Sequence, residues 1–156
     1  MLEVNIDLPV KGYPVYIDTG FDNFTGCMDK AGLGGKAVII TDQNVDGIYS
    51  EAFASQLKPY CQEVFKYVLE AGEKSKTLDT VRDIYAFLMD CRLERSSVLI
   101  ALGGGVVGDI TGFAAATFLR GINFVQVPTT LLAQADSSIG GKVGVDFQGS
   151  KNIIGS

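Results

Sequence analysis

The sequence predicts an α/β fold, in which helices flank an open, mostly parallel sheet and a pair of strands precedes it at the N-terminus. Three observations support this prediction. Short apolar runs lack polar alternation, as in strands that are covered on both faces. Stretches with apolar residues at helical spacing lie between these runs. A glycine-rich loop directly follows one run, at the carboxyl end of a strand, where open α/β sheets bind their ligands.

The composition fits one domain of a folded protein, since the 156 residues are 47% hydrophobic and 20% charged. A net charge of −5 argues against a nucleic-acid partner. The absence of histidine excludes imidazole bases and imidazole metal ligands within these residues. Cys27, Cys61 and Cys91 are widely spaced and indicate neither a disulfide framework nor a zinc site. With no signal peptide and no apolar run long enough to span a membrane, we expect a soluble, cytoplasmic protein.

Three strands and one helix are predicted within residues 2–57. Residues 2–7 and 13–18 predict a hairpin or two paired edge strands, separated by the turn-forming residues Pro9, Lys11 and Gly12. Residues 36–41 form a β-branched apolar run and predict a buried strand. Asn44 is then the expected N-cap of a helix whose apolar stripe occupies residues 45–57.

Strands and helices continue to alternate along the rest of the chain. Further strands are predicted at 63–69, 97–102 and 123–127. Between the first two lies a helix with the apolar face Leu78, Val81, Ile84, Tyr85 and Leu88. Between the last two, residues 106–119 predict an almost wholly apolar helix that ends at Gly121.

Residues 103–156 differ in composition from the rest of the chain. They hold eleven of the 19 glycines but only six charged residues: Asp109, Arg120, Asp136, Lys142, Asp146 and Lys151. Burial in the middle of a sheet explains part of this composition. Glycine at this density also exposes backbone N–H groups to an anion, so the remaining charges are candidates for ligand contacts.

Residues 103–108 read GGGVVG, which satisfies the G-x-G-x-x-G pattern directly after a strand and at the start of a helix. In a Rossmann-like fold such a loop cradles a pyrophosphate. The usual acidic ribose partner is missing at the end of the next strand, and Asp42 and Glu73 are alternatives. Each is by itself more often a helix cap or a solvated acid. Asp109, expected in the first helical turn, either complements the helix dipole or contacts a ligand or Lys142.

Residues 128–144 combine hydroxyl groups, one carboxylate, several glycines and one lysine. Such a mixture is costly in a core unless the polar groups are paired. We therefore interpret this segment as the wall of a binding site.

Four blocks of the sequence resemble the 3-dehydroquinate synthases, which are sugar-phosphate cyclases of the shikimate pathway. The blocks are Gly72–Lys76, Gly103–Asp109, Pro128–Gly144 and Lys151–Asn152. With their spacing, the resemblance covers essentially the whole chain. The glycine loop alone also fits the glycerol dehydrogenases and iron-dependent alcohol dehydrogenases, whereas the block at 128–144 is far more specific.

The resemblance implies two sets of site residues. NAD contacts are implied for Asp42, Asn44, Glu73, Lys76, Gly104, Gly105, Val106, Val107, Gly108, Asp109, Thr129, Thr130, Lys142 and Lys151. Substrate contacts are implied for Asp136, Lys142 and Asn152, and for Arg120, which matches a residue that reaches the phosphate from the neighbouring subunit of a homodimer.

In the family, NAD transiently oxidises a ring alcohol of a seven-carbon sugar acid phosphate, phosphate is eliminated, the hydride is returned and an aldol step closes the carbocycle. The family's zinc ligands, a glutamate and two histidines, belong to a C-terminal domain outside these residues. We therefore expect residues 1–156 to be an NAD-binding N-terminal domain without a metal site, which is inactive alone and binds NAD weakly. Two alternatives remain: a stand-alone NAD or nucleotide-binding module, and an NAD-dependent polyol dehydrogenase.

Overall fold

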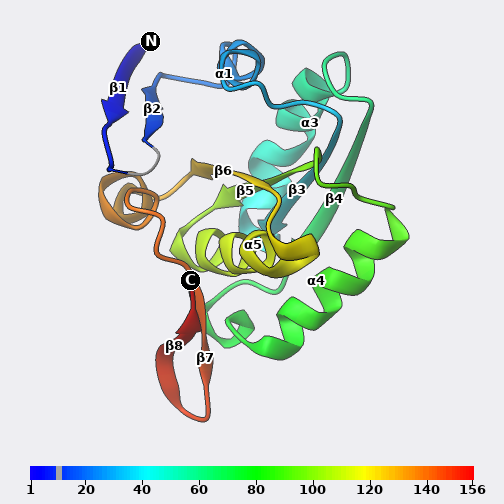
Figure 1. Cartoon of the computed structure of the whole chain (residues 1–156), viewed down its shortest axis with the longest axis vertical. Helices are drawn as coiled ribbons and strands as arrows, with labels where there is room; N and C mark the ends of the chain where they lie inside the picture. Colours follow the sequence, from blue (N-terminus) through cyan, green and yellow to red (C-terminus); the bar gives the residue numbers. More distant parts are fainter. Residues whose placement is uncertain (10–11) are drawn as a thin grey trace.

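A four-stranded parallel sheet forms the centre of the computed structural model, which describes residues 1–9 and 12–156 (Figure 1). The strand order is β4-β3-β5-β6, and the strands are β3 (Lys36–Asp42), β4 (Glu63–Leu69), β5 (Val98–Gly103) and β6 (Asn123–Pro128). All three adjacent pairs are parallel. The predicted α/β class is therefore confirmed.

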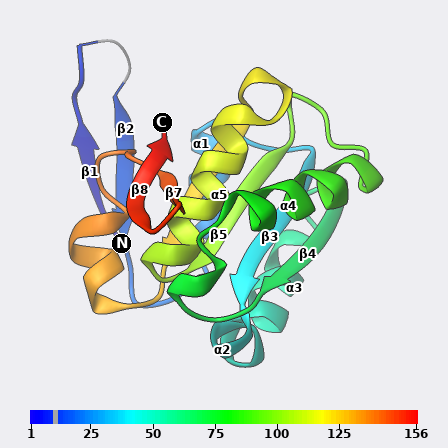
Figure 2. The same cartoon turned by 90° about the horizontal axis from the view of Figure 1, so that it is seen from below.

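Helices cover both faces of the sheet (Figure 2). α1 (Phe24–Lys30) and α3 (Glu51–Leu57) pack on one face, and α4 (Leu78–Asp90) and α5 (Gly105–Thr117) on the other. This division follows from the strand order, because right-handed crossovers in opposite directions along a sheet place their helices on opposite faces. The β3-to-β4 crossover runs one way, and the crossovers from β4 to β5 and from β5 to β6 run the other way.

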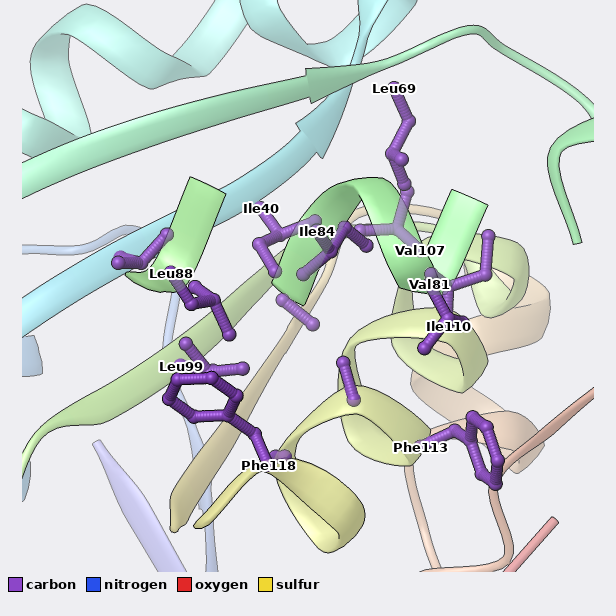
Figure 3. Close-up of a cluster of buried hydrophobic side chains, with 14 of the residues drawn as sticks. Ile40, Leu69, Val81, Ile84, Leu88, Leu99, Val107, Ile110, Phe113 and Phe118 are labelled. Atoms are coloured by element: carbon purple, nitrogen blue, oxygen red, sulfur yellow. The ribbon is translucent and has the colours of Figure 1, made fainter. Parts of the chain in front are cut away.

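The two faces of the sheet bury separate apolar clusters. Ile40 of β3 and Leu99 of β5 belong to the cluster under α4 and α5 (Figure 3). Ile39 and Ile100, which are adjacent to Ile40 and Leu99 in the sequence, belong to the cluster under α1 and α3. All four side chains are fully buried. Burial on both faces explains why these strands show no alternation in the sequence.

The sheet has a topological switch point between β3 and β5. From β3 the chain first moves to β4 at one edge and then crosses back to β5 on the other side of β3. The carboxyl ends of β3 and β5, at Asp42 and Gly103, therefore lie beside each other with their connections leading to opposite faces. Ligands of open α/β sheets bind in the crevice at such a point.

The N-terminal strand pair is also confirmed. β1 (Leu2–Ile6) and β2 (Tyr13–Ile17) form a separate antiparallel sheet in which Val4 pairs with Val15. Lys11, expected in the intervening turn, lies outside the described residues.

The expected helix at 45–57 is divided into three parts: α2 (Gln43–Val45), a π-helical turn η1 (Asp46–Ser50) and α3. The prediction of Asn44 as its N-cap is wrong. Asp42 is the cap, because its extended backbone lets Oδ1 accept hydrogen bonds from the N–H groups of Asn44 at 2.9 Å and Val45 at 3.1 Å.

The remaining elements are short. η2 (Glu73–Ser75) and η3 (Phe118–Arg120) are 3₁₀ turns, and η4 (Ala133–Ser137) is a π-helical turn. β7 (Gly144–Phe147) and β8 (Ser150–Gly155) form an antiparallel hairpin, which projects from the body in Figure 1. Within the described ranges, no helix combines the length and apolar character that a membrane crossing requires.

Candidate functional site

The glycine loop ends at the uncapped start of α5. Gly104 is the extended residue before the helix, and no described side chain caps this end. Helix geometry leaves the N–H groups of residues 105–107 without partners inside the helix, so they can bind an anion. The N–H of Gly108 is not available, because it donates to the carbonyl oxygen of Gly104 at 3.0 Å.

The segment after β6 lies against this loop. A Cβ atom on Gly105 would lie 3.0 Å from Ser137 Oγ, and one on Gly104 would lie 3.2 Å from Thr130 Cγ2. The hydroxyl oxygens of Thr129 and Ser137 are buried without a hydrogen-bond partner among the described residues. A polar ligand at the start of α5 would satisfy such groups.

An open cavity of about 340 Å³ adjoins the loop, lined by Asp109, Asp136, Ser137, Ile139, Gly140 and Lys142. It brings together Asp136 and Lys142, two of the residues predicted to contact substrate. Lys142 is exposed, so its ammonium group can reach a ligand. A cavity with carboxylates and a lysine fits a polar, charged ligand better than an apolar one.

Lys76 joins two parts of the predicted site. Its ammonium group pairs with Asp109 Oδ2 at 2.5 Å and donates a hydrogen bond to Asn152 Oδ1. Asp109 thus contacts Lys76 rather than Lys142. It also lies beyond the first turn of α5, contrary to expectation, because the helix begins at Gly105.

Asp146, a candidate by composition only and not among the residues that the resemblance implies, lies within the same group of hydrogen bonds. Its Oδ1 accepts a hydrogen bond from the N–H of Asn152 at 2.8 Å, and its own N–H donates to the carbonyl oxygen of Lys76 at 2.9 Å. In the sequence, Asp146 is one of only six charged residues among the glycine-rich residues 103–156. Beside it, Lys151 and Glu73 form an exposed ion pair at 3.1 Å.

Asp42 and Asn44 lie at the carboxyl end of β3, beside the switch point. Asp42 is half-buried and Asn44 is exposed. The turn that they begin is fixed to β4 by Lys66, which donates to Asp46 Oδ1 at 2.6 Å. This hydrogen bond holds the pKa of the Asp46 carboxyl below its usual value.

Thr130 and Arg120, two further residues implied by the resemblance, do not line the cavity. Thr130 is exposed, and its Oγ1 accepts a hydrogen bond from the N–H of Ala133 at 3.2 Å, which caps the turn that contains η4. Arg120 lies in the 3₁₀ turn beyond the far end of α5, and the helix extends about 12 Å from Asp109 to its last residue, Thr117. It is therefore not brought together with the cavity residues of its own chain.

These residues fit a dinucleotide but not a metal ion. The uncapped helix, the close glycines and the orphaned hydroxyls suit a pyrophosphate, and the acids near the switch point suit ribose hydroxyls. In contrast, the described residues contain no group of three or more histidine, cysteine or acidic side chains placed to hold a metal ion.

Two solved structures share this fold. A 2-deoxy-scyllo-inosose synthase complexed with carbaglucose-6-phosphate, NAD+ and Co2+ superposes with a TM-score of 0.90 at 24% identity, over 99% of this chain and 43% of that chain. A 2-epi-5-epi-valiolone synthase from Streptomyces hygroscopicus with NAD+ and Zn2+ bound gives a TM-score of 0.74 at 33% identity, over 81% of this chain and 35% of that one.

Sequence comparison gives the family. The 3-dehydroquinate synthase of Acetivibrio thermocellus is 58% identical over 156 residues, which are 100% of this chain and 43% of the relative. The chain therefore spans less than half the length of that protein. The family model described as 3-dehydroquinate synthase N-terminal matches residues 66–156. These matches show that the chain belongs to the 3-dehydroquinate synthase family, in its N-terminal part.

Proposed function

We propose that residues 1–156 are the NAD-binding N-terminal domain of an enzyme that converts 3-deoxy-D-arabino-heptulosonate 7-phosphate to 3-dehydroquinate and phosphate in the shikimate pathway. The observation that carries this proposal is the uncapped start of α5 at the switch point, where Gly104 and Gly105 approach the segment after β6. The family membership then selects the reaction.

The N–H groups of residues 105–107 would hold the pyrophosphate of NAD, because they are the free donors at the positive end of the helix dipole. NAD, when bound, accepts a hydride and later returns it, so the overall reaction has no net redox change. The further contacts proposed for NAD are Asp42, Asn44, Glu73, Lys76, Gly104, Gly108, Asp109, Thr129, Thr130, Lys142 and Lys151, with Gly108 contributing close packing rather than its N–H group.

The cavity beside this loop would hold the sugar acid phosphate. Lys142 supplies a cation for the substrate's anionic groups, and Asp136 accepts hydrogen bonds from its hydroxyl groups. Asn152 contributes a side-chain amide from the β7–β8 hairpin. Arg120, remote from the cavity of its own chain, would reach the substrate phosphate of a neighbouring subunit in a homodimer.

No catalytic step through a metal ion is assigned to these residues. Zinc would be held by the C-terminal domain that completes the cleft in the full-length enzyme. We place the enzyme in the cytoplasm, because all three cysteines are free thiols, as is usual in a reducing compartment.

The test compares the 156-residue chain with a fusion of this chain to the remaining C-terminal part of the Acetivibrio thermocellus enzyme. Phosphate release from the heptulosonate phosphate is measured with NAD and zinc present. The chain alone should release none, whereas the fusion should release phosphate without accumulating NADH. A fusion that carries Lys142→Met should lose about tenfold or more in turnover.

Turnover by the chain alone would contradict the proposal, as would a folded fusion that releases no phosphate. Steady accumulation of NADH with a polyol would instead support a glycerol dehydrogenase-like activity.

A further inference from the structure

We propose that Lys76 is a positioning residue, which ties the β7–β8 hairpin to α5 and thereby sets the place of Asn152. The side chain of Lys76 is only 5% exposed, and its two partners lie 33 and 76 residues away in the sequence. A buried ammonium group is costly unless it is paired, so this arrangement is stable only while both partners stay in place.

Lys76, Asp146 and Asn152 form a closed ring of hydrogen bonds. The Lys76 carbonyl oxygen accepts from the N–H of Asp146, the Asp146 carboxylate accepts from the N–H of Asn152, and Asn152 Oδ1 accepts from the Lys76 ammonium group. The ring holds both the backbone and the side chain of Asn152. It also stabilises the left-handed conformation of Asn152, whose φ is 53°.

β8 has two other attachments to the body of the protein: Ile154 packs against the core cluster under α5, and Lys151 forms an exposed ion pair with Glu73 at 3.1 Å. Within the part of the chain that the structure describes, β8 pairs only with β7, and residues 150–153 are exposed. The partner strand is better anchored, because Val145 of β7 is fully buried in the core cluster under α5. A two-stranded hairpin is marginally stable by itself. Because residues 150–153 are exposed, the hydrogen bond from the buried Lys76 is what we expect to set the position of the Asn152 side chain.

This link has a consequence for ligand binding, which rests on the proposed function. Asp109 follows the NAD-binding loop, and Asn152 is on the substrate side, so a single cation connects the two sides of the site. Ordering of the start of α5 by NAD should then also order β8. Lys76 couples the two ligand sites through Asn152, in addition to any contact of its own with NAD.

Hydrogen exchange of the β8 amides in the 156-residue chain tests the link without ligand. Asn152→Gly keeps the left-handed backbone and deletes the acceptor, and it should speed exchange in β8 by about tenfold or more, the scale of a lost hydrogen bond to a charged group. Asn152→Asp should exchange like the original chain, because its carboxylate still accepts from Lys76. Lys76→Met should match Asn152→Gly.

Gln148→Gly is the matched control, since Gln148 has a φ of 48° in the same hairpin and no hydrogen bond to Lys76. Equal β8 exchange in Asn152→Gly and Gln148→Gly would overturn the link, even if Lys76→Met fails to fold. Repeating the exchange measurement with NAD separates the link through Lys76 from the proposed NAD-binding function. If the original chain does not bind NAD, the proposed function is contradicted. The link, which is measured without ligand, is unaffected by that outcome.

Discussion

At the residue scale, Gly105 determines whether a phosphate can approach the start of α5. We predict that Gly105→Val weakens NAD binding by at least about tenfold, because its Cβ would lie 3.0 Å from Ser137 Oγ and its methyl groups would occupy space beside the free N–H groups. Calorimetric titration of NAD into both forms measures the effect.

The control for this substitution is Gly26→Val in α1, where a Cβ meets nothing within 4 Å. It should leave the affinity unchanged. If Gly105→Val binds NAD as tightly as the original chain while remaining folded, the cofactor does not bind at this loop.

The side-chain types of the site could be anticipated from the sequence, whereas their pairing could not. The sparse charges after residue 103 include Asp109 and Asp146, both of which take part in the hydrogen bonds around Lys76. However, Lys76 meets Asp109 and Asn152 only through tertiary packing across 33 and 76 residues. No local pattern encodes such separations, so the ring around Asn152 emerged only from the structure.

At the element scale, Gly112 sets how closely α5 packs. A Cβ there would lie 2.4 Å from Val143 Cγ1 and 2.9 Å from the Phe124 ring. We predict that Gly112→Ala destabilises the fold by about 1–3 kcal/mol through overpacking, although alanine is normally the better helix former. Urea unfolding followed by circular dichroism measures the change.

Gly26→Ala provides the comparison, because Gly26 is also helical but faces open space. It should be neutral or stabilising by up to about 1 kcal/mol. Val143→Ala should recover part of the loss in Gly112→Ala. Equal effects of the two glycine substitutions would show that helix propensity, rather than close packing, governs this position.

Strong periodicity made most central elements predictable. The buried strands and the amphipathic α4 were expected because burial selects long apolar patterns. α1 has only 7 residues and contains Gly26, so its pattern is too short to detect. The β7–β8 hairpin turns at Gln148 and Gly149, which both have positive φ, but the flanking strands are short and mostly polar or exposed.

At the scale of the whole molecule, the class of fold was predictable but the strand order was not. Alternating strands and helices give a parallel sheet with right-handed crossovers, and several strand orders satisfy that rule. The order β4-β3-β5-β6 is set by which apolar faces pack together, and it creates the switch point between β3 and β5. The location of the candidate site thus depends on tertiary contacts.

The most direct test of the central claim is a titration of the 156-residue chain with NAD, followed by the amide signals in ¹H–¹⁵N NMR spectra. Saturable shifts should concentrate at residues 104–107, which include the free N–H groups of residues 105–107 at the start of α5, even if the affinity is weak. The amides of the β1–β2 sheet should not move. A spectrum in which residues 104–107 stay unchanged at high NAD concentration, or in which the shifts gather elsewhere, would contradict the account.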